Sequence, residues 1–588
     1  MLRRSWAVAA GGSRLAADRG GVEMANRTFE IGLVGAGAIS AGAYTAGVVD
    51  FLVQALDAWY AAKGRDALAP PHEVKLSVFA GASAGGITAA LAAAYLGSDQ
   101  PPVTTAQQGD ANDGRNKLFD CWVDRIDIAS LLDSRDLAHP HSEVLSLLDS
   151  TVLGEIADAG LDVTPRPERR PYVAEKFELC LTVTNLRGVP YAFQVLGDRP
   201  TNYDMSLHAD HVRFSIGDAQ NGNAVDRYPM RWKDFGAASS LKEKLKESAL
   251  ASGAFPFGLA PRTLSHVLTG DGRQDWYSAR QWPVPTPDSS DPHRCVTPRA
   301  IPANWGALGG NYIYRYQCVD GGVMNNEPFE LARQLLAGSG GRNPRAGAAA
   351  DKAILLIDPF PSDTSFEPGY SPAPDLLKTA LRLFAALKNQ ARFKPEELML
   401  AAQEDVFSRF MIAPSREGAA QPIACGALGG FGGFLKRDFR AHDFFLGRRN
   451  CQKFLRDHFV LPENNPLFEA WTEAMKSAHC VRDAQGECRR GDGLRLLPII
   501  PLLGAAGAGD CHKPAWPRYA QEDLERLMRR VERRIDVVLD HLVTQYFKTN
   551  NLIVRFIAKL VLGRKQRDVA DFVRETVAAD LRRMGLME

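Results

Sequence analysis

Ser83 lies in a pattern that is typical of an activated nucleophile. It stands between Gly81 and Gly85 in Gly-Ala-Ser-Ala-Gly, the Gly-x-Ser-x-Gly spacing of a nucleophile elbow. The apolar run before it, residues 74–80, suits a buried strand, and the alanine-rich run after it, residues 87–94, suits a helix. A sharp turn between the two needs small neighbours, because strained backbone and close chains leave no room for a Cβ. The same pentapeptide also occurs by chance in plain turns, so the surrounding sequence has to decide.

A glycine-rich loop follows the first predicted strand, residues 29–34, and leads into a helix predicted over residues 46–61. The loop consists of Gly37, Ala38, Ile39, Ser40, Ala41 and Gly42. A dinucleotide site would need a third glycine where Ser40 stands, and an acidic residue where the second strand runs into Ser83. Because backbone amides in such loops bind anions, we predict instead an oxyanion hole, completed by the amide of Ala84 at the start of the next helix.

Asp320 is the candidate partner of the serine. It ends a strand predicted over residues 312–319, and Gly321 and Gly322 follow it. An aspartate in this position can lie bare in a cleft, although by itself a helix-capping role is commoner. Strands that alternate with helices predict a mostly parallel sheet covered on both faces, with sites at the carboxyl ends of the strands. We therefore expect Asp320, Ser83 and the glycine-rich loop at one edge of the sheet.

Taken in order, the glycine-rich loop, the elbow around Ser83 and the Asp-Gly-Gly turn resemble the patatin-like phospholipase family. Residues 248–256 are similar to the family's Ala/Ser-rich segment that ends in Phe-Pro. The resemblance covers residues 27–360 and implies an α/β three-layer sandwich, a mostly parallel sheet with helices on both faces. It also implies a Ser83–Asp320 dyad that acts on lipid acyl esters without a catalytic histidine or a metal. The family loop usually reads Gly-Gly-Gly-x-Arg-Gly, so the role of the missing arginine must be filled otherwise here.

From these residues we expect a serine hydrolase of glycerophospholipids or lysophospholipids that needs no cofactor. Asp320 would accept the proton of Ser83 as general base, and water would hydrolyse the acyl-enzyme. The alternatives are an acyltransferase or neutral-lipid esterase with the same dyad, and a non-catalytic lipid-binding protein. A Ser-His-Asp triad is disfavoured, because α/β-hydrolases lack a glycine-rich loop so early in the chain. The histidines late enough for such a triad are His442, His458, His479, His512 and His541.

The composition is that of an ordinary globular protein, with 588 residues, 45% hydrophobic and 24% charged. A formal net charge of +1 gives no signal for a nucleic-acid partner. The nine cysteines are scattered without a metal-ligand spacing and favour a reducing, cytoplasmic location, although Cys480 and Cys488 are close enough to pair. No window is an uninterrupted apolar run of the roughly 18 residues that a membrane span needs.

We divide the chain into a disordered leader over residues 1–26, a catalytic domain over residues 27–460 and a mainly helical extension over residues 461–588. Residues 429–450 combine Gly, Phe and Arg, and fit either a lid facing lipid or, as we prefer, a packed segment with paired arginines.

Two helices are predicted in the extension. The first spans residues 522–543 and packs by an apolar face, with Arg529, Arg530, Arg533 and Arg534 off that face. The second spans residues 552–562 and carries an apolar stripe beside a basic one. Residues 548–567 therefore suit either peripheral contact with an anionic membrane or docking on the protein, and we weigh the two equally.

Overall fold

The computed structural model describes residues 27–195, 201–218, 225–268, 276–277, 280–285, 296–306, 312–338, 343–361, 379, 383, 386, 389–390, 406–416, 418–419, 421–546 and 569–588. The predicted leader, residues 1–26, and the predicted helix over residues 552–562 lie outside the described residues.

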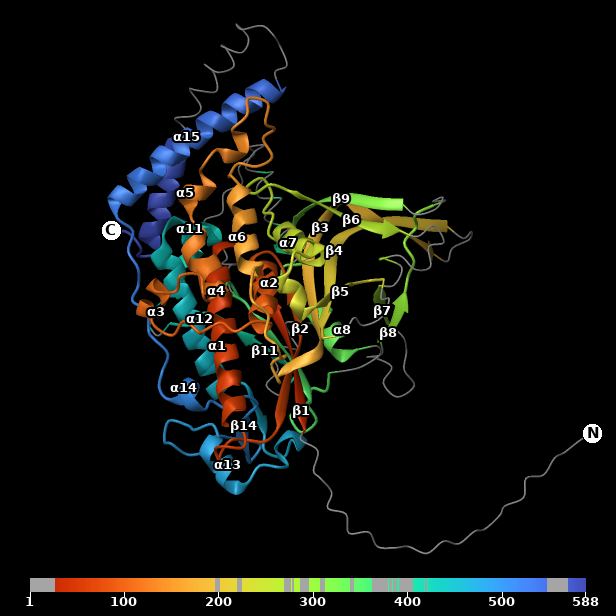
Figure 1. The fold of residues 1–588 in the computed structure, drawn as a ribbon, viewed down its shortest axis with the longest axis vertical. Coiled ribbons are helices and arrows are strands. Elements are labelled where there is room, and N and C mark those ends of the chain that lie inside the picture. The colour runs from red at the N-terminus through yellow and green to blue at the C-terminus, as the bar shows by residue number, and fades with distance from the viewer. Residues whose placement is uncertain are drawn as a thin grey trace, which may run out of the picture.

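A nine-stranded sheet lies at the centre of the molecule (Figure 1). Its strands are β1 (Thr28–Gly35), β2 (Glu73–Gly81), β3 (Val173–Val195), β4 (Thr201–Gly217), β5 (Tyr228–Arg231), β6 (Arg262–Leu268), β9 (Tyr312–Asp320), β10 (Lys352–Ile357) and β11 (Arg409–Ile412). They run in the order β11-β10-β1-β2-β3-β4-β5, while β9 pairs with β3 and β6 pairs with β9. The strands from β11 to β3 are parallel, and β4 and β9 run antiparallel to β3. The prediction of a mostly parallel sheet is confirmed.

Helices cover both faces of the sheet. Side chains alternate between the two faces along each strand, and the buried strands carry apolar side chains on both, so both faces need cover. The covering helices are α1 (Gly42–Ala62), α2 (Ala84–Leu96), α8 (Phe329–Ala337) and α12 (Arg437–Asp457). On β1, Ile31 and Leu33 pack in the large core with α1, α2 and α12, whereas Val34 packs with α8 on the other face. Figure 1 shows α1 and α12 on one side of the sheet and α8 on the opposite side.

The remaining elements connect these layers or extend them, and they include a helix over residues 569–583 near the end of the chain. The other helices are η1 (Ile39–Ala41), α3 (Ala106–Asp110), α4 (Lys117–Phe119), η2 (Asp120–Arg125), α5 (Ile128–Leu131), η3 (Arg135–Leu137), α6 (Thr151–Leu161), η4 (Trp232–Gly236), α7 (Ser240–Ser252), η5 (Gly321–Val323), η6 (Ala424–Gly430), α11 (Gly432–Leu435), η7 (Pro466–Phe468), α13 (Glu473–His479), α14 (Gly504–Gly507) and α15 (Gln521–Tyr546). The other strands are β7 (Gln281–Pro285), β8 (Val296–Ala300), β12 (Val460–Pro462), β13 (Arg490–Gly491) and β14 (Leu494–Pro498).

One segment of the described chain, Ile39–Ala62, has the length and mean hydropathy, 1.3, of a membrane-crossing helix. Asp50 and Asp57 interrupt its apolar run, which is why the sequence contains no unbroken window. The apolar window is 89% buried inside the protein. The helix α1 in this segment packs against α12 so closely that a Cβ at Gly47 would overlap the carbonyl of Phe444.

The segment predicted over residues 429–450 is packed, as we preferred, and three of its four arginines, Arg437, Arg448 and Arg449, are paired with carboxylates. Arg437 bonds to Asp124 at 2.8 Å, and the buried Arg448 forms an ion pair with Asp50 of α1. Arg440 is only 1% exposed and donates to backbone carbonyls. These contacts fix α12 to the first half of the chain.

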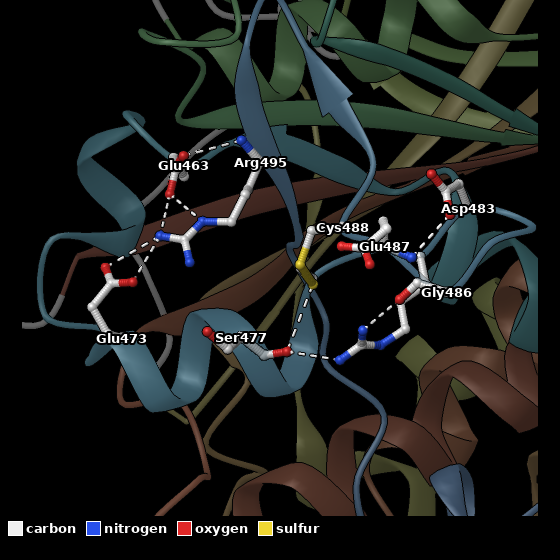
Figure 2. Close-up of a disulfide and its surroundings, with 10 residues drawn as sticks. Glu463, Glu473, Ser477, Asp483, Gly486, Glu487, Cys488 and Arg495 are labelled. Atoms are coloured by element: carbon white, nitrogen blue, oxygen red, sulfur yellow. Dashed lines mark hydrogen bonds and ion pairs between the residues drawn. A yellow bond between two sulfur atoms is a disulfide. The ribbon is translucent and has the colours of Figure 1, made fainter.

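A small satellite sheet forms at the amino ends of β1 and β2. Its strands run in the order β12-β14-β13, and α13 packs beside them. The structure joins Cys480 and Cys488 in a disulfide. Figure 2 shows this bond together with Arg495, whose guanidinium contacts Glu463 at 2.7 Å and Glu473 at 3.0 Å. This cross-linked unit lies at the end of the sheet away from Ser83.

The helix predicted over residues 522–543 is present as α15, but one of its arginines does not lie where we expected. Arg534 is 3% exposed, whereas we placed it off the buried face. It donates to both carboxylate oxygens of Asp136, at 2.6 and 2.8 Å, and to the carbonyl of Leu147 at 2.9 Å. Arginine is buried here because these acceptors satisfy its fork of donors.

Candidate active site

Ser83 occupies a strained turn between β2 and α2. Its φ is +54° and its ψ is −126°, a backbone conformation that a residue with a Cβ rarely adopts. The flanking glycines make the turn possible, because a Cβ at Gly81 would overlap the backbone of Gly85, and one at Gly85 would overlap the carbonyl of Gly35. The serine is therefore presented by backbone that has no space for larger neighbours, as expected for an elbow.

The hydroxyl of Ser83 donates a hydrogen bond of 2.6 Å to Oδ2 of Asp320. The other carboxylate oxygen of Asp320 accepts the backbone amide of Gly322 at 2.7 Å. Ser83 is 6% exposed and Asp320 is 4% exposed, so the pair is largely shielded from water. Within the described chain, the Ser83 hydroxyl donates to Asp320 alone. The two residues that the sequence singled out are thus brought together in hydrogen-bond geometry.

Asp320 reaches the serine by a route that we did not predict. We placed it at the carboxyl end of a parallel strand, but β9 runs antiparallel to β3. The two residues meet because β3 continues beyond the end of β2. In the register, Gly81 of β2 pairs with Leu181, and Asp320 pairs with Val183, two positions further along β3. Ser83 lies two residues beyond Gly81, and so at the same level as Asp320.

Three residues that sequence reasoning did not select hold Ser83 and Asp320 in place. The amide of Ser83 donates to Oγ of Ser252 at 3.0 Å, and the amide of Asp320 donates to the carbonyl of Ala254 at 2.8 Å. The hydroxyl of Thr184 donates to the carbonyl of Asp320 at 2.8 Å. Ser252 and Ala254 lie in the segment whose resemblance was noted above, and that segment was the available signal for both.

Gly37 brings the glycine-rich loop against the nucleophile. A Cβ at Gly37 would lie 3.1 Å from Cβ of Ser83, so glycine permits the close approach of backbone. The amide of Gly37 donates to the carbonyl of Asn326 at 3.1 Å, and the side-chain amide of Asn326 donates back to the Gly37 carbonyl at 3.4 Å. Asn326 follows the Asp-Gly-Gly turn, so this residue, which we did not select, ties the loop to the turn.

Several amides of the predicted oxyanion hole are already engaged. Besides Gly37, the amide of Ala41 donates to the carbonyl of Ala38 at 2.9 Å, and that of Gly42 donates to Ser40. These bonds close the short helix η1. The amides of Ala38 and Ile39 have no acceptor among the described residues, and Ile39 has a φ of +49°. Both remain candidate donors to an oxyanion.

The amino end of α2 supplies the other candidate donor. The first bond of the helix runs from the amide of Ile87 to the carbonyl of Ser83, at 3.0 Å. The amide of Ala84 therefore has no acceptor within the helix, and the helix dipole points its positive end at the site. Of the seven residues predicted for the hole, Ala38, Ile39, Ser40 and Ala84 are those whose amides have no acceptor among the described residues.

The late histidines are engaged in other parts of the structure. His442 bonds to Asp443 at 2.7 Å, His479 to the carbonyl of Leu68 at 2.9 Å and His541 to the carbonyl of Val537 at 3.0 Å. His458 and His512 have ring contacts with Phe454 and Phe445. The described residues thus give no support to the alternative of a Ser-His-Asp triad.

Comparisons with known proteins show the family of the chain. The family described as Patatin-like phospholipase matches residues 33–333, which include the loop, Ser83 and Asp320. Uncharacterized protein y4iI of Sinorhizobium fredii (strain NBRC 101917 / NGR234) is 34% identical over 597 residues, which cover 94% of this chain and 81% of that protein. The crystal structure of VipD from Legionella pneumophila aligns over 94% of this chain and 88% of that one, with 10% identity and a TM-score of 0.22, too low to carry an argument. The chain belongs to the patatin-like phospholipase family of lipid hydrolases.

Proposed function

We propose that the protein hydrolyses acyl esters of glycerophospholipids or lysophospholipids through a dyad of Ser83 and Asp320. The observation that carries this proposal is the 2.6 Å hydrogen bond between the serine hydroxyl and the buried carboxylate. A nucleophile and a base in hydrogen-bond contact, with the base oriented by a third group, are the parts that nucleophilic acyl transfer requires. The amide of Gly322 orients the carboxylate here.

The reaction proceeds in two halves. As Oγ of Ser83 bonds to the ester carbonyl carbon, its proton passes to Asp320, and the carbonyl oxygen becomes an oxyanion beside the amides of Ala38, Ile39 and Ala84. The oxyanion collapses, the bond to the alcohol breaks, and the alcohol leaves with the proton from Asp320. Water then attacks the acyl-enzyme and gives a proton to Asp320, which returns it to Ser83 as the fatty acid is released. Each amide donor lowers the barrier by about 3 kcal/mol.

Exposed apolar side chains on segments near Ala254 and Asp320 in the chain support a lipid substrate, and we call them the rim. The rim consists of Leu145, Leu147, Phe257 and Met324, which are 60%, 57%, 75% and 42% exposed. The amide of Leu147 donates to the carbonyl of Phe257 at 2.8 Å, which joins two segments of the rim. Phe257 has a φ of +65°, and a bulky residue in this strained conformation is a candidate for function. Phe257 follows Ala254, the backbone partner of Asp320, by three residues, and Met324 follows Asp320 by four.

Apolar side chains continue inward from the rim. The rings of Phe255 and Phe431 meet edge to face with centroids 5.3 Å apart, and Phe431 packs in one cluster with Ile39 of the glycine-rich loop. An acyl chain that enters past the rim would therefore meet apolar surface beside the oxyanion donors. Since Ser83 is 6% exposed, some of these side chains must move to admit a substrate. Residues 548–567, for which we weighed membrane contact and docking on the protein equally, lie outside the described residues, and both alternatives remain predictions.

The proposal is tested by release of fatty acid from mixed phospholipid vesicles. We expect Ser83→Ala to reduce kcat/KM by at least about 10⁴-fold, and Asp320→Asn by about 10²- to 10⁴-fold, because amide nitrogen cannot accept the proton. A chelator should leave the rate of hydrolysis by the wild-type protein unchanged. Ser98→Ala, which removes a buried hydroxyl at the far end of α2, is the matched control. Hydrolysis that persists in Asp320→Asn would exclude the dyad, and a wild-type protein that releases no fatty acid would contradict the proposal as a whole.

The same assay tests the rim. Phe257→Asp should reduce hydrolysis of vesicles by about tenfold or more, because burying one aromatic side chain in an acyl layer contributes about 1.5–3 kcal/mol. Hydrolysis of a short, water-soluble ester should stay within twofold of wild type. Val267→Asp, at an equally apolar and 58% exposed position on β6, is the control. Equal losses on both substrates would show that Phe257 does not contact the lipid surface.

A further inference from the structure

Ser40 joins the glycine-rich loop to a segment nearly four hundred residues later. Its hydroxyl donates to the carbonyl of Gly430 at 2.5 Å and accepts the amide of Gly433 at 3.0 Å. Ser40 is 0% exposed, so water does not compete for either bond. The contact is closed by a glycine, since a Cβ at Gly433 would lie 2.6 Å from Oγ of Ser40. A serine therefore occupies the middle of the loop and uses both bonds of its hydroxyl.

The segment that receives Ser40, residues 424–435, is itself held from several sides, and we call it the clamp. The carboxylate of Asp443 on α12 accepts the amides of Ala424 and Cys425, at 2.9 and 2.7 Å. The guanidinium of Arg440, also on α12, donates to the carbonyl of Gly433 at 2.6 Å. Asp443 is 0% exposed and Arg440 is 1% exposed. Buried charges whose hydrogen bonds are satisfied make this hold stiff.

Two further anchors connect the clamp to distant parts of the chain. Arg440 donates to the carbonyl of Val123 at 2.9 and 3.1 Å, and so ties the clamp to η2. Asp580, in the helix over residues 569–583, accepts the amide of Leu428 at 2.6 Å. The clamp lies beyond residues 33–333, the part of the chain that the family match covers.

We propose that the clamp positions the glycine-rich loop for catalysis, with Ser40 as the positioning residue that links the two. This inference rests on the proposed function, because it assigns the amides of Ala38 and Ile39 to the oxyanion. Those amides belong to the two residues just before Ser40 in the chain, so a shift of Ser40 moves them with it. A misplacement of about 1 Å at such donors costs roughly a hundredfold in rate. In this proposal the clamp fills the role of the arginine that the family loop usually carries and that this loop lacks.

The first readout of the test is kinetic. Ser40→Ala removes both bonds, and we expect kcat to fall about 10- to 100-fold with KM within twofold, because oxyanion donors act in the transition state. Inhibition by a long-chain trifluoromethyl ketone, whose adduct with Ser83 carries an oxyanion, should weaken in proportion to kcat/KM. Asp580→Ala, at the outer anchor, should give a smaller loss of the same kind. Ser98→Ala is the matched control for loss of a buried hydroxyl.

The second readout is hydrogen–deuterium exchange, which does not depend on activity. Faster exchange of residues 37–42 and 424–435 in Ser40→Ala, with the rest of the folded protein unchanged, is the expected result. Unchanged exchange in these segments would contradict the claim that Ser40 holds the loop to the clamp. Faster exchange together with a wild-type kcat would contradict the claim that this contact positions the loop for catalysis. If the wild-type protein hydrolyses no ester, the proposed function fails, whereas exchange still decides whether the clamp holds the loop. A Ser40→Ala protein that does not fold leaves both readouts to Asp580→Ala.

Discussion

Ser252 shows how a single hydroxyl keeps the strained backbone at Ser83 in place. The amide of Ser83 cannot join the ladder of β2 or the helix α2, because the turn points it away from both. Oγ of Ser252, at the end of α7, accepts that amide at 3.0 Å. A Cβ at Gly86 would lie 2.5 Å from the same oxygen, so the glycine leaves space for it. The hydroxyl thus satisfies a buried donor whose loss would free the elbow to relax.

We predict that Ser252→Ala lowers kcat by about tenfold and the free energy of unfolding by about 1–3 kcal/mol, since it leaves a buried amide without an acceptor. Ser248→Ala on the same helix is the control, because its hydroxyl only bonds to the carbonyl of Lys244 within the helix. Steady-state kinetics and urea denaturation of both variants check the prediction. Equal kinetics in the two variants would show that the elbow does not need Ser252.

At the scale of elements, helix packing through glycine explains why the two halves of the chain fit so closely. Gly47 of α1 faces Phe444 of α12, and Gly447 of α12 faces Tyr44 of α1, each with backbone where a Cβ would stand. The buried pair of Asp50 and Arg448 adjoins this crossing. The distance between α1 and α12 is therefore set by backbone and leaves no room for one methyl group.

Gly47→Ala should destabilise the protein by about 3 kcal/mol or more, because the added methyl forces two packed helices apart. Gly154→Ala in α6 is the matched change, since no atom lies within 4 Å of its Cβ position. There the substitution should stabilise by about 0.5–1 kcal/mol through the better helix propensity of alanine. Thermal denaturation of the two variants measures the contrast, and similar melting temperatures would contradict it.

For the molecule as a whole, the sequence predicted the central strands and the elbow, because each depends on a local pattern. That Ser83 and Asp320 would meet was expected from the order of three motifs and the family resemblance, because Asp320 by its local pattern alone fits a helix cap. It did not predict that β9 would run antiparallel, since strand direction depends on partners that periodicity does not encode. The sequence also did not predict the bonds of Ser40 to residues 430–433 or the burial of Arg534, because both depend on contacts between segments that are distant in the chain. The domain boundaries and the cellular location stay predictions.

Whole-molecule stability should fall in acid because of buried neutral histidines. Burial lowers the pKa of His72 from 6.5 to about 3, and its ring is held by the carbonyl of Ile499 and the indole of Trp471. Below pH 6.5 the unfolded chain binds a proton at His72 that the folded protein does not bind. The contribution of His72 to the free energy of unfolding is therefore complete above pH 6.5 and is lost as the pH falls towards 3. His266, whose pKa is also lowered to about 3, adds to the effect.

The free energy of unfolding should therefore fall less steeply with pH in His72→Gln. Between pH 6.5 and pH 4 we expect its slope to be smaller than in the wild type by about 1.4 kcal/mol per pH unit. Urea denaturation across this range measures the slope. The exposed His139, changed to Gln, is the control and should keep the wild-type slope. A variant slope equal to that of wild type would show that His72 is not the neutral group.

The pairing of α1 with α12 also has a consequence on the ribosome. Asp50 and its partner Arg448 are 398 residues apart, so at 5–20 residues per second α1 waits roughly 20–80 s for the helix that buries it. During that time a helix with the length and hydropathy of a membrane span is without its final cover. The nascent chain thus exposes this apolar segment until α12 has been synthesised, and the pairing of the two helices then buries it.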